Sequence, residues 1–120
     1  MHAMKKRDRG FCGFGEAYFS IVHGGAVKGW KRHRAMTLNL IPVRGEIRVI
    51  VRADREDYAA FHLSPGSPAT YNRLTVPPGL WVAFGGVGPG VNTLLNVADL
   101  EHDPEESETQ LLEDLPWCWG

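Results

Sequence analysis

The stretch GAVKGWKRHRAMTLNL, residues 25–40, contains two short segments in which apolar and polar side chains alternate. We interpret AVKGWKRHR (residues 26–34) and MTLNLIPV (residues 36–43) as β-strands, because a period of two is typical of a strand with two different faces. Side chains two residues apart on a strand point to the same face. The pattern therefore predicts that Lys31 and His33 share one face.

The same alternation recurs along the chain, with glycine or proline in most of the gaps. The other predicted strands are residues 16–23, 46–54, 71–79, 80–86 and 92–100. In residues 46–54 one face is predicted to meet a core and the other mostly water. LSPGSPAT (residues 63–70) is predicted to be a loop. About eight short antiparallel strands close most naturally as a jelly roll, so the sequence predicts an all-β fold.

Composition limits the classes of function. A chain of 120 residues with a formal net charge of −1 predicts one domain, residues 1–120, and argues against nucleic acid or anionic membrane as partners. Residues 101–114 are predicted to be an acidic tail, poorly ordered or with short helical turns. No apolar run reaches the ~18 residues of a membrane span, which favours a soluble, cytoplasmic protein. Cys12 and Cys118 match no disulfide or metal spacing and are predicted to be reduced and structural.

A family resemblance rests on six segments that cover nearly the whole chain: FGEAYFS, KGWKRHRAMTLNL, VRGEIRVIV, LTVPPGLW, HDPEE and DLPW. They resemble the dTDP-4-dehydrorhamnose 3,5-epimerase family, and especially its shorter relatives with a W-H-x-H segment. The resemblance implies a cupin-type jelly-roll β-barrel (a double-stranded β-helix) that forms a homodimer. It also implies action on a nucleotide-linked 4-keto-6-deoxy sugar without metal or redox cofactor. In the family a histidine removes the proton beside the carbonyl and a tyrosine returns one.

This chain departs from the family at both of those positions. The family's R-G-L-H corresponds to Lys28-Gly29-Trp30-Lys31, so a lysine stands where the base is expected. The expected tyrosine falls at Leu100 or Glu101, and a further cavity histidine falls at Val82.

The start of the chain also departs from the family. The motif D-x-R-G-x-F normally precedes the segment matching FGEAYFS by a full strand, whereas RDRGFCGFGE (residues 7–16) compresses both. We expect truncation at the start, with a deletion as the alternative.

A metal-binding cupin site is not expected. The ligand positions of the wider cupin pattern fall on Lys31, His33, residue 37 or 38, and Val82, so one histidine ligand remains. The other histidines lack ligand spacing and are expected in surface or loop positions: His2, His23, His62 and His102. We therefore predict no metal site.

Candidate site residues follow from strand geometry and from the resemblance. Lys31 and His33 are alternative catalytic bases; the competing interpretation makes them the cationic lining of a pocket for phosphate or carboxylate. By resemblance, Asp114 corresponds to a late carboxylate that orients the base, with a surface acid as the alternative. The candidate substrate-binding residues are Lys28, Thr37 and Asn39. Which face of the strand carrying the last two meets the cavity is left open.

Three functions compete at this point. The first is a metal-independent isomerase or epimerase of a nucleotide-linked deoxy sugar, with a weakened or altered site. The second is a sugar-nucleotide-binding barrel without turnover. The third is a structural or regulatory partner of another sugar-modifying protein. Proton exchange in the sugar separates the first from the second.

Overall fold

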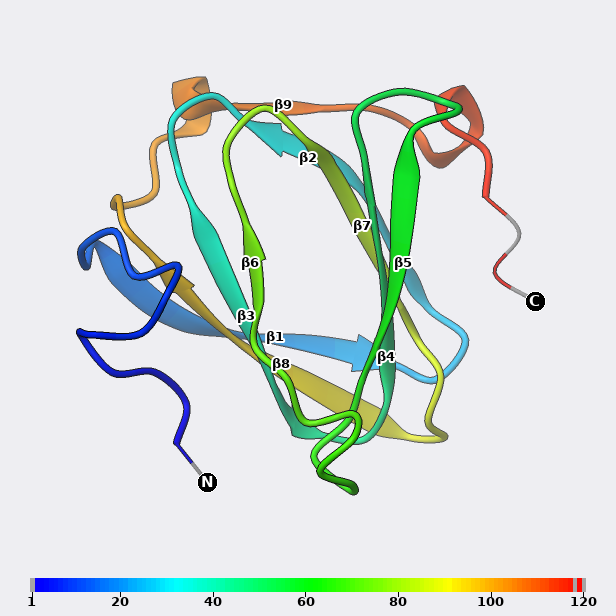
Figure 1. Ribbon diagram of the computed structural model, residues 1–120. Coiled ribbons are helices and arrows are strands. Elements are labelled where there is room, and N and C mark those ends of the chain that lie inside the picture. The colour runs from blue at the N-terminus through cyan, green and yellow to red at the C-terminus, as the bar shows by residue number, and fades with distance from the viewer. Residues whose placement is uncertain (1, 118, 120) are drawn as a thin grey trace.

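A computed structural model describes residues 2–117 and 119, which form two antiparallel sheets facing each other (Figure 1). The strands are β1 (Glu16–His23), β2 (Val27–His33), β3 (Leu38–Arg44), β4 (Ile47–Arg52), β5 (Tyr58–Leu63), β6 (Leu74–Val76), β7 (Trp81–Gly86), β8 (Val91–Ala98) and β9 (Ser107–Thr109). The first sheet has the order β1-β8-β3-β6 and the second β5-β4-β7-β2-β9. Two 3₁₀ turns, η1 (Pro104–Glu106) and η2 (Leu112–Asp114), flank β9. The predicted all-β jelly roll is confirmed.

The strand predictions differ from the structure mainly in three edge strands, β6 of the first sheet and β5 and β9 of the second. β1 matches its predicted bounds, whereas the strand predicted at residues 71–79 is only the three residues of β6. β5 and β9 were not predicted. β5 alternates weakly and is exposed along most of its length, and β9 lies in the segment predicted to be an acidic tail. Of the two alternatives for that segment, the structure shows the short helical turns, η1 and η2, and adds β9, which pairs with β2.

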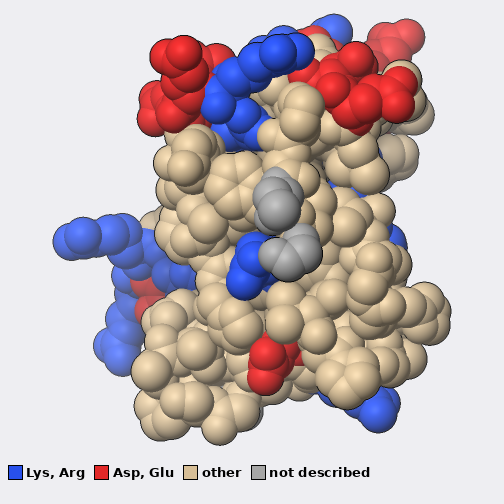
Figure 2. Space-filling model, turned by 90° about the vertical axis from the view of Figure 1, so that its right-hand side faces the viewer, with Lys and Arg blue, Asp and Glu red and all other residues tan. Residues whose placement is uncertain are grey.

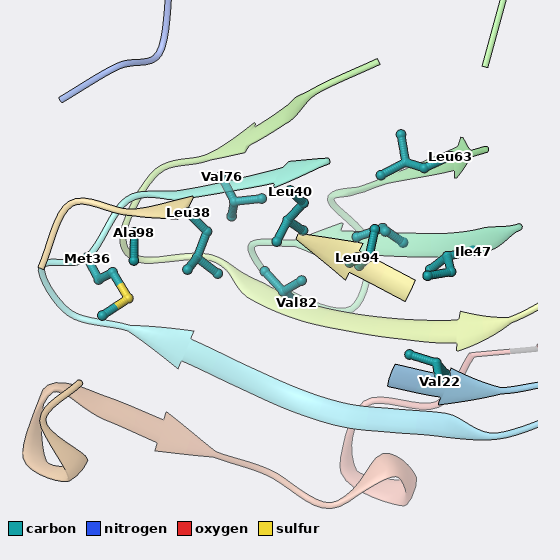
Figure 3. Close-up of a cluster of buried hydrophobic side chains, with 11 residues drawn as sticks. Val22, Met36, Leu38, Leu40, Ile47, Leu63, Val76, Val82, Leu94 and Ala98 are labelled. Atoms are coloured by element: carbon teal, nitrogen blue, oxygen red, sulfur yellow. The ribbon is translucent and has the colours of Figure 1, made fainter. Parts of the chain in front are cut away.

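The core lies between the sheets, where the inward side chains of both meet (Figure 3). The alternation predicted for β4 is correct on this side, since Ile47 and Val49 are fully buried. At the turn between β3 and β4, Gly45 adopts a φ of +77°, which glycine reaches without strain. The buried members of the cluster are Val22, Met36, Leu38, Leu40, Ile47, Val49, Leu63, Val76, Val82, Leu94 and Ala98.

A second cluster covers the outer face of the second sheet. Trp30 of β2 and Ile50 of β4 are buried there beneath Leu115, and the Trp30 Nε1–H donates a hydrogen bond to the Leu115 carbonyl at 2.8 Å. The expectation that this face of β4 meets water is therefore wrong, because the chain after β9 folds back over it. Figure 2 shows this side of the molecule: the charged side chains gather mainly at the end that holds β9, and the broad middle is largely uncharged.

The N-terminal segment lies against the outer face of the first sheet. Asn39 Nδ2 donates to the Gly10 carbonyl at 3.1 Å, and Arg73 of the β5–β6 connection pairs with Asp8 at 3.2 Å. Cys12, in this segment, is exposed and so is not part of the core, whereas Cys118 lies outside the described residues. Within the described residues, none of the helical segments is long and apolar enough to span a membrane.

Candidate functional site

A cavity of about 220 Å³ opens between the two sheets beside the core. Side chains from β1 and β8 form one wall, and side chains from β2 and β7 form the other. The lining residues are Tyr18, Ser20, Lys28, Gly29, Lys31, His33, Leu38, Val82, Phe84 and Asn96. Cationic groups and one imidazole thus lie among apolar side chains, which is typical of a site for an anionic organic molecule.

A β-bulge in β2 brings both lysines to the cavity. Lys28 pairs with Phe84 and Lys31 pairs with Val82, so the two residues between them on β2 oppose one residue on β7. Without the extra residue, side chains three apart would point to opposite faces. Trp30 and Arg32 point to the outer face, as expected. The bulge therefore places the ammonium groups of Lys28 and Lys31 on the same wall as His33.

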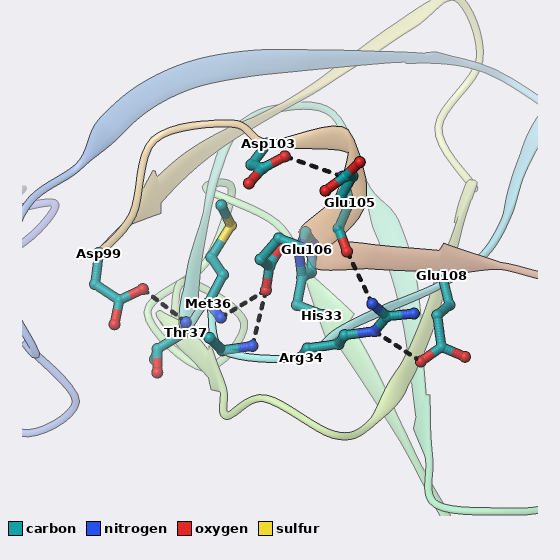
Figure 4. Close-up of polar contacts among 10 residues, drawn as sticks. His33, Arg34, Met36, Thr37, Asp99, Asp103, Glu105, Glu106 and Glu108 are labelled. Atoms are coloured by element: carbon teal, nitrogen blue, oxygen red, sulfur yellow. Dashed lines mark hydrogen bonds and ion pairs between the residues drawn. The ribbon is translucent and has the colours of Figure 1, made fainter.

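His33 is held by a carboxylate that sequence reasoning did not identify. Its Nδ1 lies 2.6 Å from Glu106 Oε1 in η1, and both side chains are largely buried. The second oxygen of Glu106 accepts the backbone N–H groups of Ala35 and Met36, each at 2.8 Å (Figure 4). Three donors thus fix the carboxylate, and the carboxylate fixes the imidazole.

The charge state of Glu106 follows from these contacts. Burial alone would raise the pKa of the carboxyl, but the hydrogen bond from His33 and the two backbone donors outweigh it and lower the pKa to about 2. Glu106 is therefore ionised at neutral pH and accepts the proton on Nδ1. Among the described residues no hydrogen bond reaches His33 Nε2; in the tautomer that carries the proton on Nδ1, this nitrogen is the acceptor.

The opposite wall carries a phenol. Tyr18 and Ser20 alternate on β1 and face the cavity, and Asn96 of β8 donates to the Ser20 hydroxyl at 3.1 Å. Burial, and to a smaller extent the nearby Glu16 carboxylate, raise the pKa of Tyr18 above its usual value. The phenol is therefore protonated at neutral pH and can donate. The base candidate and this donor come from different sheets, on two sides of one cavity.

A second hollow of about 300 Å³ adjoins the first, since Tyr18 and Lys31 line both. Its remaining lining residues are Glu16 and His102. Either hollow alone is small for a nucleotide-linked sugar, because sites for ligands of that size have volumes of roughly 300–1,000 Å³. A ligand of that size would therefore occupy both hollows, which meet at Tyr18 and Lys31.

The structure brings together Lys28, Lys31 and His33 but places the other predicted site residues elsewhere. Asp114 lies in η2, where its carboxylate accepts the N–H of Leu111 at 3.3 Å, and the carboxylate beside His33 is Glu106 instead. Thr37 and Asn39 do not line the cavity, because Leu38 occupies the inward position on this strand.

Asn39 instead bonds the Thr75 hydroxyl and the Gly10 carbonyl on the outer face of the first sheet. Val82 lines the cavity as an apolar group, whereas Leu100 and Glu101 lie outside its lining. Among the described residues no three His, Cys, Asp or Glu side chains are grouped as metal ligands would be.

Two site residues were missed, for different reasons. Tyr18 shares the alternation of β1 with Ser20, so its face was readable, but nothing in the sequence says that β1 lies opposite β2. Glu106 is one acid among several in a segment rich in them, and only the fold shows which acid meets His33. The segment HDPEE (residues 102–106), which contains Glu106, is one of the six segments that resemble the family, and this resemblance was the available signal for Glu106.

Comparison with known proteins identifies relatives among solved structures. No family model matches the chain, and no curated protein matches it either. A dTDP sugar isomerase from Desulfovibrio desulfuricans G20 superposes with a TM-score of 0.86 and 31% sequence identity, over 98% of this chain and 79% of that one.

Two further solved structures share the fold at lower identity. QdtA, a sugar 3,4-ketoisomerase from Thermoanaerobacterium thermosaccharolyticum in complex with TDP, gives a TM-score of 0.69 at 15% identity, over 85% of this chain and 73% of that one. A double mutant of ChmJ, a 3′-monoepimerase from Streptomyces bikiniensis in complex with dTDP, gives 0.74 at 16%, over 90% of this chain and 58% of that one. The identity and coverage of the Desulfovibrio protein establish that this chain belongs to the cupin-fold family of dTDP-sugar isomerases and epimerases.

Proposed function

We propose that this protein binds a nucleotide-linked 4-keto-6-deoxy sugar and moves a proton at a carbon next to the ketone. The observation that carries the proposal is the pair formed at 2.6 Å by His33, which lines the cavity, and the ionised Glu106 behind it. A neutral imidazole whose Nδ1–H is held by a carboxylate presents Nε2 as a base, and the carboxylate stabilises the imidazolium that forms.

Tyr18 is the group that we infer returns the proton. Inverting a carbon requires removal of the proton from one face of the ring and delivery to the other. The phenol lies on the β1 wall, across the cavity from the β2 wall that carries His33. It stands in place of the tyrosine expected at position 100 or 101.

Lys28 is the residue that we infer binds the diphosphate. Its ammonium group lines the same cavity and, among the described residues, neither it nor Lys31 forms an ion pair. Lys28 is exposed to solvent where it lines the cavity, so its ammonium group can meet a diphosphate that enters from outside.

Hydrogen exchange tests the proposal. Wild-type protein is incubated in heavy water with dTDP-4-keto-6-deoxyglucose, and deuterium beside the ketone is followed by NMR. We expect exchange by the wild type and a loss of roughly 10²- to 10⁴-fold in His33→Gln, the usual contribution of a general base. His62→Gln is the matched control, because His62 is exposed on β5 and lies outside the cavity. Equal rates in both variants would exclude His33 as the base.

A binding barrel without turnover is the second candidate function. The substitutions at the family's base, acid and Val82 positions favour it, because binding needs charge and shape only. Under this candidate, dTDP binds with an affinity that falls in Lys28→Ala, and heavy water gives no exchange with any variant. Exchange by the wild type excludes it.

The homodimer and the cytoplasmic location stay predictions. The outer face of the first sheet supports the homodimer: Phe19 and Ile21 of β1 are 64% and 51% exposed, and both point away from the cavity. β1 is also an edge strand, and its outward positions 17, 19 and 21, like their partners 97, 95 and 93 on β8, carry no charge. Two copies related by a two-fold axis therefore meet there without like-charge repulsion.

A further inference from the structure

We propose that Lys31 is a covalent catalytic residue, whose amine forms an imine with the ketone of the bound nucleotide sugar. This inference rests on the proposed function. A lysine stands where the family's histidine is expected. Its primary amine can form an imine with a ketone, which an imidazole cannot do.

The first support is the placement of the lysines. The chain has four, and two of them, Lys28 and Lys31, line one small cavity because of the bulge in β2. The other two, Lys5 and Lys6, lie in the N-terminal segment. Bulges next to functional sites commonly re-aim a side chain, and this one adds a second amine to the cavity wall.

The second support is the surroundings of Lys31. Its cross-strand neighbour on β7 is Val82, and Leu38 and Phe84 also line the cavity. No carboxylate among the described residues pairs with it. Lysine amines form imines with carbonyl substrates, and Lys31 is half-buried where it lines the cavity.

The third support is the distance along the strand between Lys31 and the base. Two residues on one face of a strand are separated by roughly 6.5 Å. The lysine side chain is long and flexible, so its amine can reach a ketone carbon whose neighbouring carbon lies beside the imidazole of His33. The nucleophile and the base can therefore act on adjacent atoms of one molecule.

The chemistry balances without any further reagent. The Lys31 nitrogen adds to the ketone carbon, both amine hydrogens are transferred to the ketone oxygen, and the oxygen leaves as water while the C=N bond forms. A proton taken up from the solvent by the imine nitrogen makes the C=N group a stronger electron acceptor than the ketone, and this proton is released again when the imine is hydrolysed. His33 Nε2 then takes the proton from the adjacent carbon, leaving an enamine. Protonation of that carbon and addition of water regenerate ketone and free amine.

Reductive trapping tests the imine directly. The full chain is mixed with dTDP-4-keto-6-deoxyglucose and sodium cyanoborohydride, which converts an imine into a stable secondary amine. Intact-mass analysis and peptide mapping then locate the adduct. We expect one ligand per chain at Lys31, an adduct yield at least about tenfold lower in Lys31→Arg, and an unchanged yield in Lys6→Arg. With dTDP-glucose, which has no ketone, no adduct forms.

The outcomes separate this inference from the proposed function. Exchange in heavy water by the wild type, without an adduct at Lys31, overturns the imine and leaves the proposed function intact. The imine is also overturned if the adduct is spread equally over the four lysines, or if Lys31→Arg exchanges deuterium at the wild-type rate. Absence of both exchange and dTDP binding in the wild type counts against the proposed function itself.

Discussion

β1 and β2 form opposite walls of the same cavity, and their outer faces differ. Each strand sends alternate side chains inward: Tyr18 and Ser20 from β1, Lys31 and His33 from β2. The outer face of β2 is covered by the chain's own C-terminal segment, which buries Trp30. The outer face of β1 leaves Phe19 uncovered. The β2 wall is thus stabilised from within the chain, and the β1 wall has an apolar surface free for a second copy.

Trp30→Ala is expected to have the largest effect on stability. The substitution removes a fully buried indole and its hydrogen bond to the Leu115 carbonyl, so the free energy of unfolding should fall by about 3–5 kcal/mol. Urea unfolding followed by circular dichroism measures the change. Phe19→Ala is the control from β1, with an expected change below about 0.5 kcal/mol. Equal losses in the two variants would contradict the difference between the walls.

Acid should act on the β2 wall through Glu106. The pKa of this carboxyl is about 2 in the folded protein, against an ordinary value of 4.5. A lowered pKa stabilises the fold above pH 4.5, and this stabilisation is lost as the pH falls through 2. At about 1.4 kcal/mol per pKa unit the contribution is roughly 3 kcal/mol.

The free energy of unfolding between pH 5 and pH 2 tests this expectation in the wild type and in Glu106→Gln. Asp54 and Glu108 also have lowered pKa values, from backbone hydrogen bonds and from the Arg32 hydrogen bond respectively, so the wild type alone cannot isolate Glu106. The variant should lose stability less steeply than the wild type. If the free energies of unfolding of the two proteins fall in parallel with pH, the hydrogen bonds to Glu106 do not lower its pKa as described.

Arg32→Ala should have a smaller effect on the same wall. The guanidinium lies 4.6 Å from the centre of the Trp81 ring and 2.8 Å from Glu108, but both partners of the ion pair are about one third exposed. Partly exposed pairs of this kind contribute about 1 kcal/mol or less. Chemical unfolding at low and high salt measures it; a loss above about 2 kcal/mol would mean that this contact, and not Trp30, anchors the segment.

Phe19→Asp should change association and hardly affect folding. At 64% exposure the side chain contributes little to the core, so the unfolding midpoint at low protein concentration should stay near that of the wild type. Sedimentation at high micromolar concentration should show dimers of the wild type and monomers of the variant. Leu111→Asp, at an exposed position beyond β9, is the matched control and should remain dimeric. A monomeric wild type, or dissociation by the Leu111 variant instead, would refute the predicted surface.

The sequence correctly predicted the strands in which apolar and polar residues alternate strongly. It also predicted the faces to which the side chains of these strands point. The faces of Lys31, His33 and Trp30 follow from a period of two, and the structure agrees with them. β9 was missed because three residues in an acidic segment carry no periodic signal. Lys28 was placed in the site by resemblance, whereas the cause of its orientation is the bulge, which no local pattern reveals. Glu106 was missed in favour of Asp114, since pairing of residues far apart in the chain is decided by the closed fold.

The bond between His33 and Glu106 joins positions 73 residues apart, and the one between Trp30 and Leu115 joins positions 85 apart. During synthesis, β2 leaves the ribosome long before the residues that hold it. A nascent chain that ends before position 106 has the cavity strands but neither the carboxylate for its imidazole nor the cover for its tryptophan. Because closing such long loops is slow, the pair of His33 and Glu106 should form only in the final stage of folding.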